Sequence, residues 1–136
     1  MSGQKVELEF LVAKGDWMTS NMRDHWRAKA AKTQRVRQRA HLETRSHMNA
    51  FRVPGFTKRV FLTVDTFYRS GPGLDDDNSQ PTVKAIRDGM VDAGLLIDDK
   101  PKYVAKTIYQ ASQKDPSLPV GCHRIVIQVE EVGEEE

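Results

Sequence analysis

The sequence predicts an α+β (mixed α/β) fold: a small single domain with elements in the order β-α-β-α-β-β. Three observations lead to this prediction. The 136 residues suffice for one core. Stretches rich in β-branched residues lie near both ends and in the middle of the chain, and two segments between these stretches have helical character. We therefore expect one sheet packed against two helices.

The first half of the chain is expected to form a strand and a long helix. Residues 6–13 alternate between polar and apolar before an apolar run, which is typical of a strand. Ser20 or Asn21 is predicted to cap a helix from about Met22 to Asn49, a stretch without Gly or Pro. The apolar stripe of this helix is thin and comprises Met22, Trp26, Ala30, Thr33, Val36, Ala40 and Met48.

The second half is expected to contribute three strands and one helix. Residues 59–68 form the clearest strand because β-branched and aromatic residues dominate there. A helix is predicted from about Gln80 to Ala93, with Pro81 in its first turn and Gly94 at its end. Its core side comprises Val83, Ile86, Met90 and Ala93. Further strands are expected over residues 103–111 and 123–132, and an acidic tail over residues 130–136 after a domain of residues 1–129.

Composition excludes several classes of protein. No run of 18 apolar residues is present, so a membrane-spanning protein is excluded. The N-terminus lacks a signal-peptide pattern, and a cytoplasmic location is expected. The single cysteine, Cys122, permits no internal disulfide, and the histidines show no zinc-ligand spacing.

Positive charge is concentrated in the long predicted helix and the residues after it. The net charge is only +2, yet eleven lysines and arginines lie between Arg23 and Arg59, against the two acidic residues Asp24 and Glu43. With so few carboxylates nearby to pair with, these side chains favour phosphate contact, although a solvated helix face is the alternative. The candidate DNA-binding residues are Arg23, Arg27, Lys29, Lys32, Arg35, Arg37 and Arg39.

Carboxylates cluster on both sides of the second predicted helix. Asp75, Asp76 and Asp77 precede it, and Asp98 and Asp99 follow it. On an extended segment, side chains at positions i and i+2 point to the same side, so Asp75 and Asp77 could share a hard cation such as Mg²⁺. The alternative is that these residues only cap the helix and favour its dipole.

Lys84 and four aromatic side chains each have two interpretations. Lys84 lies one to two turns into the same helix, within reach of a metal-bound phosphate, or it pairs with Asp88 at i+4. The aromatic residues could stack on bases or pack in the core. They are Trp17, Trp26, Phe56 and Tyr68.

Taken together, four segments resemble the RusA family of Holliday junction resolvases, which is common in phages and prophages. They are Leu74-Asp75-Asp76-Asp77-Asn78, Lys84, Asp92-Ala93-Gly94 and Ile97-Asp98-Asp99. Members of that family carry a D-x-D-N segment, a helix with a lysine, A-G or N-G, and a D-D pair. The resemblance is sharp over residues 74–99, and the element order and length fit over nearly the whole chain.

The resemblance implies a RusA-like nuclease fold and a set of roles. Asp75, Asp77 and Asp99 would bind the metal and act in catalysis, with Lys84 as the catalytic lysine and Asp98 as a less certain neighbour. Family members are homodimers that use Mg²⁺ or Mn²⁺ to nick symmetrically placed strands of a four-way junction. Whether Asp76 joins the site stays open.

Two other functions are also compatible with the sequence, and the proposed metal site requires Asp99 to lie near Asp75. The protein could be a non-catalytic phage protein that binds branched DNA, or its basic helix could bind an acidic protein. A helix of about 14 residues is roughly 21 Å long. Asp99 can therefore approach Asp75 only if the helix is shorter, the chain folds back steeply, or a partner subunit contributes.

Overall fold

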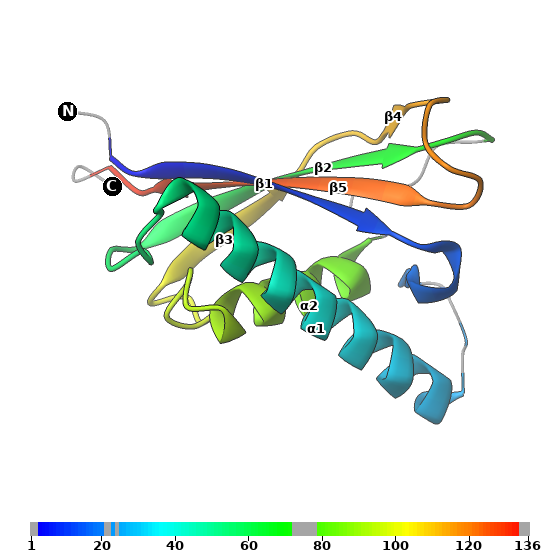
Figure 1. Ribbon diagram of the computed structural model, residues 1–136, viewed down its shortest axis with the longest axis horizontal. Helices are drawn as coiled ribbons and strands as arrows, with labels where there is room; N and C mark the ends of the chain where they lie inside the picture. The colour runs from blue at the N-terminus through cyan, green and yellow to red at the C-terminus, as the bar shows by residue number, and fades with distance from the viewer. Residues whose placement is uncertain (1–2, 21–22, 24, 72–78, 134–136) are drawn as a thin grey trace.

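A five-stranded mixed sheet carries the two helices on one of its faces (Figure 1). The computed structural model describes residues 3–20, 23, 25–71 and 79–133. The elements in chain order are β1 (Lys5–Val12), the short 3-10 turn η1 (Lys14–Asp16), α1 (Trp26–Phe51), β2 (Val60–Tyr68), α2 (Gln80–Asp92), β3 (Val104–Tyr109), β4 (Gln113–Lys114) and β5 (His123–Glu131). This confirms the predicted fold class; η1 and the two-residue β4 are additions to the predicted order.

The strands follow the order β1-β5-β2-β3, and β4 continues along β2 beyond β3. β5 is antiparallel to both of its neighbours, β1 and β2, whereas β2 and β3 are parallel. Parallel strands need a crossover connection, and α2 provides it. Alternate residues of β1, β2 and β5 are buried, so one face of the sheet packs against the helices while the other stays more exposed.

The core lies between this sheet face and the helices. Val83, Ile86, Met90 and Ala93 are all buried, which confirms the predicted core side of α2. On α1 the buried residues are Val36, Ala40, Thr44 and Met48. Within the described residues, no helix is long and apolar enough to cross a bilayer. β5 extends to Glu131, two residues into the segment that was expected to form the tail.

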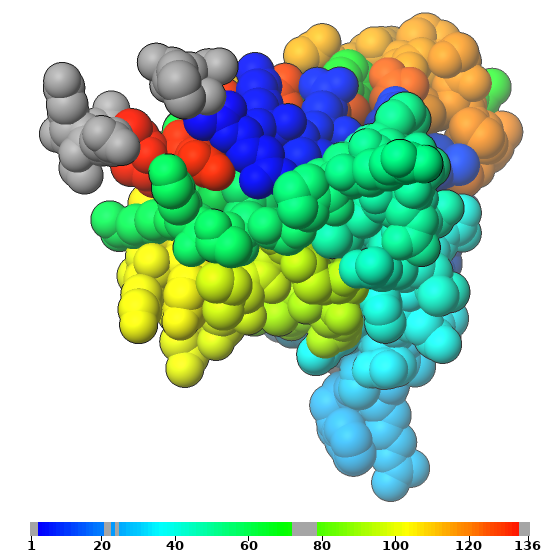
Figure 2. All heavy atoms as spheres, turned by 60° about the vertical axis from the view of Figure 1, so that its left-hand side comes forward, coloured from blue at the N-terminus to red at the C-terminus, as the bar shows by residue number. Residues whose placement is uncertain are grey.

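The start of α1 corrects the prediction in two ways. The N-cap is His25, whose Nδ1 accepts a hydrogen bond from the amide of Arg27 (3.2 Å), and not Ser20; Asn21 and Met22 lie outside the described residues. Residues 26–31 are all exposed, including Trp26, so the apolar stripe begins only farther along the helix. The reason is geometric, because the first turns of α1 extend beyond the body of the molecule, as Figure 2 shows for the light blue segment.

Thr82 attaches the segment after η1 to the buried face of α2. Its Oγ1 accepts a hydrogen bond from the amide of Met18 (2.9 Å) and donates one to the Met18 carbonyl (2.7 Å). Both residues are buried, so water cannot replace either bond. One hydroxyl therefore satisfies the donor and the acceptor of an irregular backbone segment.

We expect Thr82→Val to lower the free energy of unfolding by about 2 kcal/mol. Valine keeps the shape of threonine but leaves the amide and carbonyl of Met18 buried without partners. Thr44→Val is the matched control, because Thr44 is also fully buried and its Oγ1 has no hydrogen-bond partner in the described part of the chain. Urea unfolding measures both variants, and equal losses would contradict this account of Thr82.

Candidate active site

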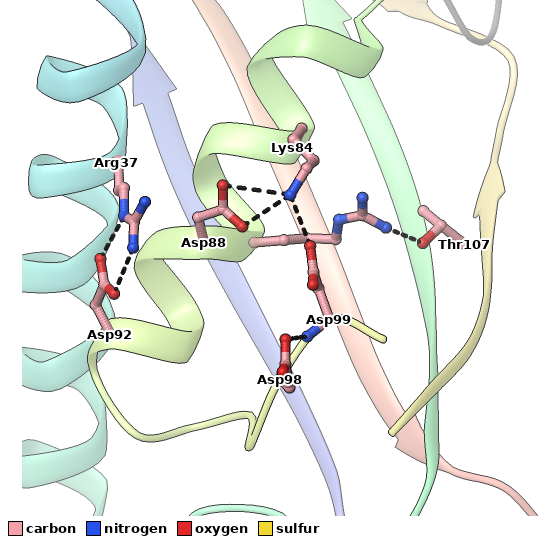
Figure 3. A network of polar contacts seen from close by, with 8 residues as sticks. Arg37, Lys84, Asp88, Asp92, Asp98, Asp99 and Thr107 are labelled. Carbon is pink, nitrogen blue, oxygen red and sulfur yellow. Dashed lines mark hydrogen bonds and ion pairs between the residues drawn. The ribbon is translucent and has the colours of Figure 1, made fainter. Parts of the chain in front are cut away.

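Lys84 lies at the centre of a charged cluster near the start of α2 (Figure 3). Its Nζ is 2.7 Å from Oδ2 of Asp99 and 3.0 Å from Oδ1 of Asp88. The i+4 pairing with Asp88 that the sequence suggested is present, and so is a second partner 15 residues away. The structure thus brings together Lys84 and Asp99, two of the four predicted catalytic residues.

Asp99 reaches Lys84 because the chain reverses steeply after α2. Gly94 has a φ of +89°, a left-handed conformation that glycine adopts at little cost. The next two residues, Leu95 and Leu96, are buried, and the Leu95 carbonyl accepts a hydrogen bond from the amide of Phe56 (2.8 Å). The chain folds back steeply, so Asp99 approaches Lys84 on α2 within one subunit; Asp75, whose approach to Asp99 was the condition set from sequence, lies outside the described residues.

Asp98 and Asp99 differ in what they contact. Oδ1 of Asp98 accepts a hydrogen bond from the amide of Asp99 (2.7 Å), and its Oδ2 is 3.8 Å from Lys100. Asp98 therefore points away from Lys84 and fixes the backbone at Asp99 (Figure 3). The arrangement makes Asp98 a positioning residue for Asp99.

The ion pair sets the charge states of its members. The hydrogen bond from Lys84 holds the pKa of the Asp99 carboxyl below its ordinary value. The same bond, with a smaller contribution from Asp88, raises the pKa of Lys84. At neutral pH Lys84 is therefore an ammonium group and Asp99 a carboxylate.

An open pocket of about 380 Å³ adjoins the ion pair. Among the residues that the structure describes, its wall contains three cationic side chains, Lys84, Arg87 and Lys106, and one carboxylate, that of Asp99. Nη1 of Arg87 donates a hydrogen bond to Oγ1 of Thr107 (2.9 Å), which ties α2 to β3. The excess of positive charge makes the pocket suited to an anionic ligand.

Arg87 and Lys106 were missed in the sequence. Arg87 lies three residues after Lys84 on α2, so its helical spacing was a usable signal. Lys106 carried no such signal, because β3 reaches the pocket only through the crossover.

The other two predicted metal ligands, Asp75 and Asp77, lie outside the described residues, as does Asp76, whose part in the site was left open. In the sequence, Asp77 precedes Gln80, a wall residue of the pocket, by three positions. Over residues 3–20, 23, 25–71 and 79–133, no three His, Cys, Asp or Glu residues group to hold a metal ion. Asp99 offers the oxygen donor that Mg²⁺ and Mn²⁺ prefer, so its chemistry fits such an ion, and further carboxylates would be needed.

Three of the predicted DNA-binding arginines on α1 do have acidic partners, contrary to the expectation from sequence: Arg35, Arg37 and Arg39. Arg35 pairs with Asp16 at 2.7 Å, and Arg39 pairs with Glu43 at 3.0 Å. Arg37 forms two hydrogen bonds with Asp92, at 2.7 and 2.9 Å. The contacts of Arg35 and Arg37 join elements that are distant in sequence, which is why counting neighbouring charges overlooked them, whereas Arg39 and Glu43 lie four residues apart on α1.

Among the seven predicted DNA-binding residues, those that are exposed and have no ion pair with a described residue lie at or just before the beginning of α1. Arg23, Arg27 and Lys29 are exposed, and Lys32 is half-buried. Neither Arg27 nor Lys29 has an ion pair with another residue that the structure describes. The cationic surface available to a ligand is therefore narrower than the seven predicted residues suggested.

Comparisons with known proteins identify no relative from which a function could be transferred. Neither models of known protein families nor curated proteins match this chain. The paired Lys84 and Asp99, the cationic pocket and the motif of residues 74–99 are thus the features from which a function can be inferred.

Proposed function

We propose that this protein is a metal-dependent, structure-selective DNA endonuclease that resolves Holliday junctions by paired symmetric nicks. The observation that carries the proposal is the Lys84–Asp99 ion pair at the wall of a cationic pocket. It unites the lysine and the last aspartate of the RusA-like motif, although 15 residues separate them. A helix-surface lysine without a site would need only Asp88, its i+4 partner.

The pocket has the charge that phosphodiester cleavage requires. Asp99, together with Asp75 and Asp77, would hold Mg²⁺ or Mn²⁺, which supplies Lewis-acid polarisation and a more acidic water. Lys84 places a fixed positive charge where negative charge develops on the attacked phosphate. Arg87 and Lys106 favour binding of the same phosphate group.

Branched DNA is the proposed substrate, bound mainly through its backbone. Arg23, Arg27, Lys29 and Lys32 would contact phosphates, which gives recognition of shape and a strong dependence on salt. A four-way junction presents two symmetric scissile strands, so we propose a homodimer. Such an enzyme would act on DNA in the cytoplasm, in recombination and repair.

A non-catalytic protein that binds branched DNA is the second candidate. One observation favours it: within the described residues, the only carboxylate in the wall of the pocket is already neutralised by Lys84. In that case the acidic segment before α2 would serve only as a cap, and cutting would be absent under every condition.

Cleavage of a labelled synthetic four-way junction separates the two candidates. We expect paired symmetric nicks with Mg²⁺ or Mn²⁺, none with chelator and none in a matched linear duplex. Asp77→Asn should abolish cutting while junction binding persists. Asp65→Asn is the matched control, because Asp65 alternates with the buried residues of β2 and so faces away from the helices. Tight junction binding without any metal-dependent cut would establish the second candidate.

A further inference from the structure

The four aromatic side chains that could each stack on bases or pack in the core differ in their exposure to solvent. Trp17 and Phe56 are buried, with exposed fractions of 4% and 3%, and Tyr68 is half-buried at the end of β2. Trp26 is 68% exposed. Of these four side chains, Trp26 is therefore the one whose ring is open to a ligand from solvent.

Trp26 is the first residue of α1, in the part of that helix that projects from the body (Figures 1 and 2). All residues from 26 to 31 are exposed, so this part of the helix buries nothing against the sheet. Helices are generally held in place by an apolar face that packs on a core. The projecting turns lack such a face, and their side chains are free to contact a ligand.

Two described neighbours contact the Trp26 ring and still leave the side chain largely exposed. The His25 ring lies with its centroid 5.8 Å from that of Trp26, and the His25 side chain is itself held by its capping hydrogen bond. The guanidinium carbon of Arg27 lies 5.2 Å from the Trp26 ring centroid. The indole is therefore partly pre-positioned, which reduces the entropy that a ligand must remove on stacking.

The surroundings of Trp26 select the chemistry of that ligand. Arg27 and Lys29 are exposed and make no ion pair with other described residues, whereas Arg35, Arg37 and Arg39 all do. A partner that combines negative charge with a flat aromatic group satisfies both features. A nucleotide has that combination, with its phosphate for the cations and its base for the indole.

We propose that Trp26 stacks on an unpaired base of bound DNA, with Arg27 and Lys29 on the flanking phosphates. The inference rests on the proposed function for its ligand and deepens it, because it adds a recognition element for branch points. In continuous duplex the bases are stacked on one another and offer no free face. An interrupted or frayed strand does offer one.

Binding of Trp26→Leu to labelled DNA tests the inference. Leucine keeps an apolar side chain but has no π face. We expect about tenfold weaker binding to single-stranded DNA and to the four-way junction, and less than about twofold weaker binding to linear duplex. The slope of the logarithm of the affinity against the logarithm of the salt concentration should stay unchanged for Trp26→Leu. For Lys29→Ala the magnitude of that slope should fall by about one, because one phosphate contact is lost.

Leu42→Ala is the matched control, because Leu42 is an exposed apolar residue farther along α1, and its loss should leave all three affinities unchanged. Equal losses on duplex and single strand, or no loss on either, would overturn the stacking role of Trp26. The wild-type protein is measured for cutting in the same experiment. If it binds and nicks junctions while Trp26→Leu behaves normally, only this inference fails; if it neither binds nor cuts DNA, the proposed function fails with it.

Discussion

Lys84→Met is expected to slow junction cleavage about 100-fold while changing junction affinity by less than about threefold. Methionine has nearly the length of lysine and removes only the charge. The ammonium lies 2.7 Å from the Asp99 carboxylate in the wall of the pocket, where a phosphate would develop negative charge during cleavage. Binding depends on many backbone contacts, so the loss of one changes it little.

Single-turnover cleavage and binding of the same labelled junction measure the two effects separately. Lys100→Met is the matched control, because Lys100 lies next to Asp99 in sequence and is 3.8 Å from Asp98, but it is 74% exposed and points to solvent. It should cut at the rate of the parent protein. Lys84→Arg keeps the charge in a wider group and should recover part of the rate. A Lys84→Met protein that cuts normally would show that Lys84 serves only to neutralise Asp99.

The sheet and the core side of α2 were predictable because they depend on local periodicity. Alternation along β1 and the spacing of Val83, Ile86 and Met90 reflect which side of each element meets the core. The start of α1 was not predictable in the same way. Trp26 fits the apolar stripe by spacing, yet the helix extends beyond the core at that point, and spacing alone does not reveal where the core ends.

The charged residues show why local counting is insufficient for a site. Asp16 and Asp92 neutralise Arg35 and Arg37 from other elements, 19 and 55 residues away in sequence. The Arg39–Glu43 pair was visible in sequence as an i+4 spacing. Conversely, Asp99 meets Lys84 only because Gly94 reverses the chain and two buried leucines hold the return segment. The residue types of the candidate site could be named from sequence, whereas their pairing required the tertiary fold.

Gly89→Ala is expected to lower the free energy of unfolding by about 3 kcal/mol, although alanine is the better helix former. Gly89 lies on α2 where that helix crosses α1. A Cβ there would lie 2.5 Å from the Arg37 carbonyl oxygen, 2.7 Å from Cβ of Ala40 and 2.8 Å from the His41 amide nitrogen. Two of these three atoms belong to the backbone, so they cannot rotate away and the helices must separate.

A double-variant comparison can separate this clash from helix propensity. Ala40→Gly removes the one side-chain contact, so adding it to Gly89→Ala should recover only part of the loss, because both backbone contacts persist. Gly15→Ala is the control, since a Cβ at Gly15 meets nothing within 4 Å and should change stability by less than about 0.5 kcal/mol. If urea unfolding instead showed Gly89→Ala to be more stable by about 1 kcal/mol, as propensity alone predicts, the close approach of α1 and α2 would be wrong. Because Lys84 lies on α2, a different packing of α2 against α1 would also change the position of Lys84.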